Sequence, residues 1–247
     1  IIKEGVPVIT AATGEPLAII EQRAEELGAD VFVCGEDFSA EMQRCSAGGQ
    51  QVAFHSLVCR ESEPYPLALA GGYQAENAAL VIMAAKLLER EDTRFTEAAL
   101  RTGLRSVRHP ARFEILAHTD GNIVIDGAHN PAGMQALRAG LDCYFPDAPR
   151  VFLLGILKDK DIDAMLAALL RPGDQVVTVR PNSERAAGAD VVAAVAAGMG
   201  ADTVACADRQ AGLAEAQRRA RACGAVLVVA GSLYLVGGIR ALLTAGR

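Results

Sequence analysis

The feature that most constrains the fold is a regular alternation of short apolar runs and helical stretches over the second half of the chain. Repeated strand–helix units of this kind predict an α/β fold with a doubly wound, mostly parallel sheet. Ligands of such sheets bind at the carboxyl ends of the strands, so the residues that follow each strand carry the functional signal. The expected strands are 113–117, 122–126, 151–155, 175–179, 203–205 and 225–230, and the expected helices are 134–144, 162–170, 189–198, 212–222 and 235–245.

The first half of the chain is less regular. Its expected elements are a strand at 6–10, a helix at 15–27, a strand at 31–33, a hairpin over 39–62 that turns at Gly48–Gly49, and helices at 74–89 and 96–102. The opening strand–helix–strand unit is best satisfied by parallel strands. Gly103 is expected to end the last of these helices.

An extended stretch separates the two patterns. Pro110 disfavours helical backbone at His109, so residues 106–112 are expected to be extended. We therefore place a domain boundary here, with one domain at 1–105 and a second at 106–247. A chain of 247 residues, of which 51% are hydrophobic, is long and apolar enough to form two such cores.

Composition excludes several classes of partner. The formal net charge is -6 and no basic stripe is present, which argues against a nucleic acid partner and against anionic membrane surfaces. No stretch has the length and apolarity of a membrane span or the form of a targeting segment. The six cysteines form no CxxC pair and lie mostly in or beside apolar runs, which favours buried free thiols in a reducing, cytoplasmic compartment.

One strand end combines several groups that are able to bind a ligand. The run 122–126 ends in Asp126-Gly127-Ala128-His129-Asn130-Pro131. Asp126 can accept hydrogen bonds from a ribose, Gly127 allows the backbone to approach a ligand, and His129 beside a helix N-terminus suits an anion. The same residues also fit a capped helix start, with Asn130 as N-cap and Pro131 in the first helical position. The pattern alone leaves both interpretations open.

Other candidate residues are weaker when taken singly. Ser232 follows the run 225–230, where it can bind a carboxylate or cap the last helix, and capping is the favoured interpretation. Asp161 is expected to be an N-cap. Arg112 follows the extended stretch, where its planar guanidinium can reach a phosphate or lie on the surface. Asn77 opens a long helix, where it can contact an adenine edge or bond locally.

Three common catalytic or nucleotide-binding motifs are absent from the sequence. It contains no Gly-x-x-x-x-Gly-Lys-Ser/Thr phosphate-binding loop, no Gly-x-Ser-x-Gly nucleophile turn and no dinucleotide-binding glycine fingerprint. The separate pieces therefore indicate only a two-domain α/β protein that binds a ligand.

The order of the pieces along the chain is more informative. The motifs are Ile1-Ile2-Lys3-x-Gly5-Val6-Pro7-Val8, Gly35-Glu36-Asp37-Phe38, Gln74-Ala75-Glu76-Asn77-Ala78-Ala79, Pro110-Ala111-Arg112-Phe113-Glu114, Asp126-Gly127-Ala128-His129-Asn130-Pro131, Gly155-x-x-x-Asp159-Lys160-Asp161 and Gly231-Ser232-Leu233-Tyr234. Together they resemble the folylpolyglutamate synthase family of the Mur ligase superfamily, including its bifunctional dihydrofolate synthase members. The resemblance spans nearly the whole chain, and the fifth and last motifs are its most specific parts.

The resemblance implies a fold and an activity. Residues 1–105 would be the C-terminal part of a central ATPase domain, and 106–247 a Rossmann-like C-terminal domain. ATP would phosphorylate the γ-carboxylate of a folate-linked glutamate, or the carboxylate of dihydropteroate. The amine of L-glutamate would then attack the acyl phosphate, giving an amide and phosphate. The resemblance also implies a cytoplasmic monomer that uses Mg²⁺ with ATP.

The resemblance carries roles to five residues. Asn77, Arg112 and Asp126 resemble residues that contact the nucleotide, with Asp126 and His129 in the catalytic set. His129 and Ser232 resemble residues that hold the incoming glutamate. No residue of this chain is expected to bind the metal, because the family's Mg²⁺ ligands, phosphate-binding loop and carbamylated lysine would lie before Ile1. The chain alone is therefore not expected to turn over ATP.

Two positions depart from the family pattern, and two other functions remain open. Tyr73 stands where the family often has histidine, and Ala111 stands where it often has glycine. An alanine is unfavourable there if the backbone needs a positive φ.

The first alternative function is that of a Mur-type ligase that joins an amino acid to a cell-wall precursor, and the second is that of a Rossmann-like binding module without catalysis.

Overall fold

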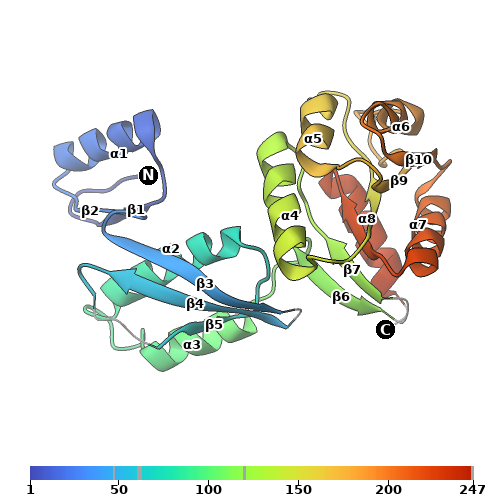
Figure 1. The fold of residues 1–247 in the computed structure, drawn as a ribbon. Coiled ribbons are helices and arrows are strands. Elements are labelled where there is room, and N and C mark those ends of the chain that lie inside the picture. The colour runs from blue at the N-terminus through green and yellow to red at the C-terminus, as the bar shows by residue number, and fades with distance from the viewer. Residues whose placement is uncertain (47, 60–62, 119–120, 246–247) are drawn as a thin grey trace. The chain divides into compact units, whose positions relative to one another are not determined.

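The computed structural model describes residues 1–46, 48–59, 63–118 and 121–245. The chain divides into two units, Ile1–Arg108 and His109–Arg247, each with its own hydrophobic core. Figure 1 labels most of the helices and strands of both units.

The first unit contains two separate sheets. β1 (Val8–Thr10) and β2 (Val31–Val33) pair in parallel across α1 (Gly14–Glu26), as the opening pattern predicted. A three-stranded antiparallel sheet follows, and α2 and α3 pack on it around a core that includes Phe38, Phe54 and Ile82. Its elements are β3 (Phe38–Ser46), β4 (Gly49–Ser56), β5 (Tyr65–Leu67), α2 (Tyr73–Leu88) and α3 (Glu97–Ser106).

The second unit is a six-stranded sheet with helices on both faces, which confirms the predicted fold class. Its strands lie in the order β10-β9-β8-β11-β7-β6, and all neighbours are parallel except β6 and β7. The elements are β6 (Glu114–His118), β7 (Gly121–Ile125), α4 (Pro131–Tyr144), β8 (Arg150–Leu154), α5 (Ile162–Leu169), β9 (Gln175–Thr178), α6 (Ala189–Gly198), β10 (Asp202–Ala205), α7 (Arg209–Cys223), β11 (Val226–Ala230) and α8 (Leu233–Thr244).

The strand order determines which face each helix covers. From β7 to β10 the chain moves outward along the sheet, and right-handed connections place α4, α5 and α6 on one face. It then returns to β11, between β7 and β8, so α7 and α8 cover the opposite face. Neighbouring strands β7 and β11 therefore lead into helices on opposite faces, which makes their carboxyl ends a topological switch point.

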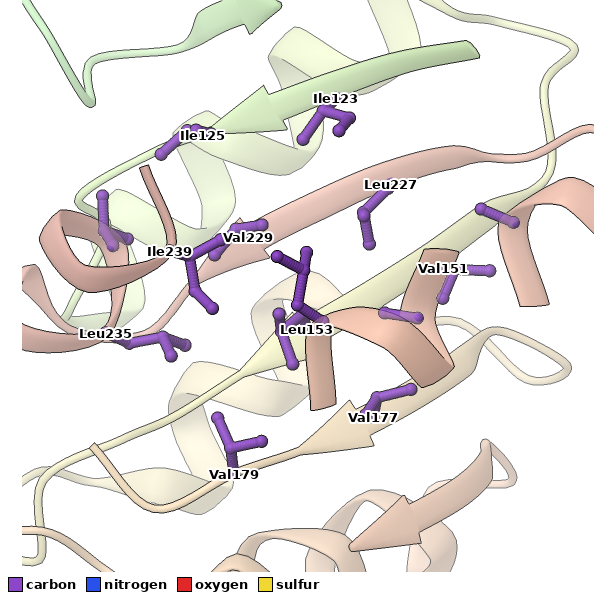
Figure 2. Packing of buried hydrophobic residues seen from close by; sticks show 14 of the residues in the cluster. Ile123, Ile125, Val151, Leu153, Val177, Val179, Leu227, Val229, Leu235 and Ile239 are labelled. Atoms are coloured by element: carbon purple, nitrogen blue, oxygen red, sulfur yellow. The ribbon is translucent and has the colours of Figure 1, made fainter. Parts of the chain in front are cut away.

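Apolar side chains of four neighbouring strands form the core under α7 and α8. Figure 2 shows them converging with Leu235 and Ile239 of α8. Burying one such side chain stabilises the fold by about 1.5–3 kcal/mol. This packing therefore holds the strand ends rigidly in place. The strand residues in the cluster are Ile123, Ile125, Val151, Leu153, Val177, Leu227 and Val229.

Several elements differ from the sequence prediction: α4 begins three residues early, at Pro131, and the stretch 106–112 is not extended throughout, because Ser106 ends a helix and Ala111 has a positive φ. β5 was not predicted, because Pro66 lacks an N–H donor, but β5 is the edge strand of its sheet and pairs only with β4. α3 continues through Gly103 to Ser106, since one exposed glycine costs about 1 kcal/mol and does not end a helix. α7 begins at Arg209, three residues early, because Asp208 accepts hydrogen bonds from the N–H groups of Gln210 and Ala211.

Two further observations concern membranes and thiols. Within the part of the chain that the structure describes, no helix combines the length and the apolarity that crossing a bilayer requires. All six cysteines lie in that part, and none of them forms a disulfide there. The expectation that they are buried was wrong, because four are half-buried and Cys143 and Cys223 are exposed.

Candidate functional site

The carboxyl ends of β7 and β11 bring most of the predicted site residues together. Ile125 lies opposite Val229, and the Asp126 N–H extends this pairing by donating to the Val229 carbonyl at 3.0 Å. Gly231 N–H donates to the Ala128 carbonyl at 3.0 Å, which joins the two loops that follow these strands. Asp126, His129 and Ser232 therefore lie at the same switch point.

Arg112 lies at this same edge of the sheet, although it precedes a strand. β6 runs antiparallel to β7, and Glu114 at its start lies opposite Ile125 at the end of β7. The Gly127 N–H donates to the Ala111 carbonyl at 2.7 Å. The loop 111–113 is thus hydrogen-bonded directly to the loop that carries Asp126 and His129.

Glycines allow the strand ends to approach this closely. Gly231 has φ +112°, and a Cβ there would lie 2.8 Å from the Gly155 carbonyl oxygen at the end of β8. A Cβ on Gly127 would lie 2.8 Å from Cδ2 of Leu233. A side chain at position 231 would push the two strand ends apart, so Gly231 is needed for the geometry of the site, whereas the exposed Leu233 side chain could move away from a Cβ at position 127.

Asp126 is buried and fixes the backbone around it. Its Oδ2 accepts a hydrogen bond from the Phe113 N–H and its Oδ1 accepts one from the Ala128 N–H, both at 2.7 Å. Short bonds to an ionised carboxylate are strong, so this side chain joins the loop 111–113 to the loop after β7.

His129 is oriented by its own loop. Its Nδ1 lies 2.8 Å from the Gly127 carbonyl oxygen. Because a carbonyl oxygen only accepts hydrogen bonds, Nδ1 carries the proton and Nε2 is the nitrogen presented to a ligand. The ring is half-buried, so Nε2 is held in one direction.

Ser232 and Asn130 both cap helices that begin at the switch point. Ser232 is buried, and its Oγ accepts from the Leu235 N–H at 3.2 Å at the start of α8. Asn130 Oδ1 accepts from the Gly133 N–H at 2.7 Å, with Pro131 as the first residue of α4, as the sequence predicted. The capping Ser232 hydroxyl keeps its O–H as a donor. Asp161 also caps its helix as expected.

The loop that carries Arg112 is locally strained. Ala111 and Phe113 have φ values of +61° and +45°, in the left-handed region that L side chains avoid at a cost of about 1–2 kcal/mol each. Ala111 therefore has the positive φ that makes alanine unfavourable at this position. Arg112 itself is exposed, and no acceptor among the described residues binds its guanidinium. The loop therefore presents this arginine outward.

Packing holds Phe113 in its unusual conformation. Its ring is buried against Tyr144, with centroids 5.2 Å apart. A Cβ on Gly140 of α4 would lie 2.5 Å from the ring atom Cε2. Gly140 therefore leaves the space that the Phe113 ring occupies, which gives a packing reason for a glycine in the middle of a helix.

Glu114 ties the same loop to α8. Its Oε2 accepts from the Ala111 N–H at 3.0 Å, and both carboxylate oxygens accept from Arg240, at 2.8 and 2.9 Å. Partial burial alone would raise the pKa of Glu114, but the hydrogen bonds from Arg240 and Ala111 and the charge of Arg240 outweigh it, so the pKa lies below its ordinary value. This stabilisation is present above the unfolded-state pKa and is lost as the pH falls through the folded-state value.

Asn77 lies in the first unit, at the start of α2. It is exposed, and its Nδ2 donates to Oε1 of the buried Gln74 at 3.0 Å. Both amides line a cavity of about 240 Å³ whose other walls are mainly apolar. A cavity lined in this way suits a heterocycle, because the ring would contact apolar side chains and its polar edge could meet an amide. The remaining lining residues include Leu67, Leu69, Val81, Leu100, Leu104 and Val107.

Comparison with known proteins identifies the second unit. Residues 111–233 match the model of the Mur ligase, glutamate ligase domain. Over 239 residues the chain is 34% identical to a probable bifunctional folylpolyglutamate synthase/dihydropteroate synthase of Halobacterium salinarum, covering 95% of this chain and 28% of that protein. The chain belongs to the folylpolyglutamate synthase family.

Solved structures of folylpolyglutamate synthases have the same fold. The enzyme of Thermotoga maritima superposes with a TM-score of 0.80 and 28% identity, over 100% of this chain and 56% of that one. The Mycobacterium tuberculosis enzyme, solved in complex with ADP and AMPPCP, has a TM-score of 0.82 at 24% identity, over 96% of this chain and 55% of that one. The chain thus spans less than two thirds of the length of these relatives.

The metal that this family's chemistry implies does not fit the residues described. Among residues 1–46, 48–59, 63–118 and 121–245, no group of three or more His, Cys, Asp or Glu side chains is placed to hold an ion. The one buried carboxylate of the site, Asp126, already accepts two backbone hydrogen bonds. These residues therefore supply no metal site through which a step of the reaction could run.

The sequence did not assign roles to several residues that build the site in this family member. Glu114 lies within the family-like motif Pro110-Ala111-Arg112-Phe113-Glu114, but its partner Arg240 is 126 positions away and nothing in the sequence pattern singles it out. Gly140 carried a weak signal, because an isolated glycine in a helical pattern often has a packing reason. Arg112, Asp126, His129 and Ser232 meet at one edge of the second unit, whereas Asn77 belongs to the first unit.

Proposed function

We propose that the intact protein joins L-glutamate to folate in an ATP-dependent reaction, forming folylpoly-γ-glutamate through an acyl phosphate. The observation that carries this proposal is the meeting of Arg112, Asp126, His129 and Ser232 at the switch point of a glutamate ligase domain. A Mur-type reaction needs an anion site and an amino acid site in contact, and these residue types meet both needs.

Each residue has a proposed part in this reaction. The exposed Arg112 offsets charge on the transferring phosphoryl group, for which its planar fork is suited. The Ser232 hydroxyl and the N-termini of α4 and α8 hold the carboxylates of the incoming glutamate. His129 presents Nε2 to the amine, and Asp126 fixes the loops that carry the other groups and contacts the nucleotide.

The first unit would supply the nucleotide base site. We propose that residues 1–105 are the C-terminal part of a central ATPase domain and that adenine enters the cavity beside Asn77. A two-stranded parallel sheet such as β1–β2 is rarely stable alone, which supports its being part of a larger sheet. The sequence has no phosphate-binding loop, so we propose that this loop and the Mg²⁺ ligands belong to residues outside this chain, that Arg112 adds to their phosphate contacts, and that the chain alone is inactive.

The function is tested by supplying one acid acceptor at a time to the intact protein. With ATP, Mg²⁺ and L-glutamate present, addition of tetrahydrofolate should cause the enzyme to convert ATP to ADP. The folate product should be longer by one glutamate. Dihydropteroate tests the dihydrofolate synthase reaction in the same assay. Turnover with a nucleotide-linked cell-wall precursor in place of folate would support the other Mur-type ligase, and no turnover with any acid would support a binding module. The same preparation tests the proposed monomer by light scattering.

Replacing Asn77 with alanine should weaken ATP binding by the intact protein about tenfold. One well-placed pair of amide hydrogen bonds to a base contributes roughly 1–3 kcal/mol of discrimination. Isothermal titration with ATP and with GTP measures this, and the preference for ATP should shrink. The matched control is Glu76→Ala, a neighbouring exposed position that lies outside the cavity lining. Equal ATP affinity in wild type and Asn77→Ala would refute the base site.

A further inference from the structure

Glu114 and Arg240 form a clamp on the loop that carries Arg112. Arg240 Nε and Nη2 donate to the two oxygens of Glu114 at 2.8 and 2.9 Å, which is the bidentate geometry of a strong pair. Glu114 Oε2 also accepts from the Ala111 N–H at 3.0 Å. The partners lie on different elements, since Glu114 begins β6 and Arg240 lies in α8.

Ala111 is held by hydrogen bonds at both its backbone N–H and its backbone carbonyl. Its N–H is bound by Glu114 and its carbonyl oxygen accepts from the Gly127 N–H at 2.7 Å. With φ at +61°, this alanine would relax to another conformation if it were not held. The side chain of Arg112 leaves the backbone one residue later, so its direction depends on these bonds.

We propose that Glu114 and Arg240 are positioning residues for Arg112. They hold Ala111 in its left-handed conformation and so keep the Arg112 guanidinium at the carboxyl edge of β7. Arg240 lies two turns along α8 from Ser232, so one helix orients both the glutamate-binding serine and the phosphate-binding arginine. The inference rests on the proposed function of Arg112 and adds two residues that do not touch substrate.

A double-mutant cycle in the intact protein tests the coupling. Arg240→Met should lower kcat on the order of 10-fold, because a small misplacement of a catalytic group has an effect of this size or larger. In an Arg112→Ala background the same substitution should lower kcat no further, since its effect is exerted through Arg112. Equal losses of kcat in both backgrounds would overturn the proposal.

Amide hydrogen exchange supplies a readout that does not need activity. Arg240→Met should raise exchange at Ala111 and Phe113 by tenfold or more, with exchange in β8 unchanged. The control is Arg219→Met, which breaks a comparable ion pair with Glu215 and Asp202 and should leave kcat and these two amides unaltered. Unchanged protection at Ala111 in Arg240→Met would also overturn the proposal.

The kinetic and exchange measurements distinguish failure of the proposed function from failure of the positioning role of Glu114 and Arg240. If the wild-type protein ligates no glutamate, the proposed function fails, while loss of Ala111 protection in Arg240→Met would still show that the clamp holds the loop. Arg240→Lys keeps the charge but cannot bind both oxygens in parallel, so it should recover only part of the wild-type kcat and protection. Full recovery by lysine would mean that charge alone suffices and would count against positioning by the bidentate pair.

Discussion

Replacing Asp126 with alanine should lower the unfolding free energy of the second unit by about 3 kcal/mol and abolish most of the turnover of the intact protein. The substitution leaves the N–H groups of Phe113 and Ala128 buried without an acceptor, and each such group costs roughly 1–3 kcal/mol. The loop 111–113 then loses its attachment to the switch point. Scanning calorimetry should show a fall of roughly 10 °C in the melting temperature.

Two further variants separate hydrogen bonding from charge at this position. Asp126→Asn retains one acceptor oxygen, so its stability should lie between those of alanine and wild type. Asp147→Ala removes an exposed acidic residue beyond α4 and should change neither stability nor turnover. If Asp126→Ala unfolds at the wild-type temperature, the two backbone bonds do not hold the site. A stable but inactive Asp126→Asn would show that the charge acts on the ligand.

The local parts of this site were predictable because neighbouring residues determine them. The structure confirms that Asn130 is the N-cap of α4 and that Pro131 is its first residue. Both roles depend only on contacts among residues 130–133. The strands and helices of the second unit follow from the period of their apolar residues, and most are within three residues of the prediction. Short-range preferences therefore determine which elements form in this unit.

Apart from helix ends such as Ser106 and Arg209, the parts that were not predicted depend on contacts between distant residues. Nothing in the period of 225–230 says that β11 inserts between β7 and β8, yet this insertion creates the switch point. The Phe113 N–H reaches Asp126 only because an aromatic residue adopts a positive φ, against its local preference. Local rules fail where tertiary contacts at a functional site overrule them, as they do at Ala111 and Phe113.

Replacing Arg112 with alanine should have the opposite profile to Asp126→Ala, with a large loss of activity and little change in stability. Its guanidinium is exposed and binds no acceptor among the described residues, so its removal breaks no contact of the folded unit. Within the described parts of the chain, its backbone N–H donates to the His109 carbonyl at 3.3 Å, and alanine keeps that bond. The melting temperature should therefore stay within about 2 °C of wild type.

The loss of activity follows from the role proposed for the guanidinium. Removing one preorganised donor to a developing negative charge typically lowers kcat by roughly 10²–10³-fold, and we expect a loss of this size for Arg112→Ala in the intact protein. Arg112→Lys keeps the charge without the planar fork, so it should recover only part of the activity. Arg221→Ala serves as the control, because it removes an exposed arginine from the C-terminal end of α7, which lies toward the amino ends of the strands. Steady-state assays at saturating ATP and glutamate, with thermal melts on the same preparations, decide the matter. Near-normal kcat in Arg112→Ala would mean that this strained loop presents its arginine for some purpose other than phosphoryl transfer.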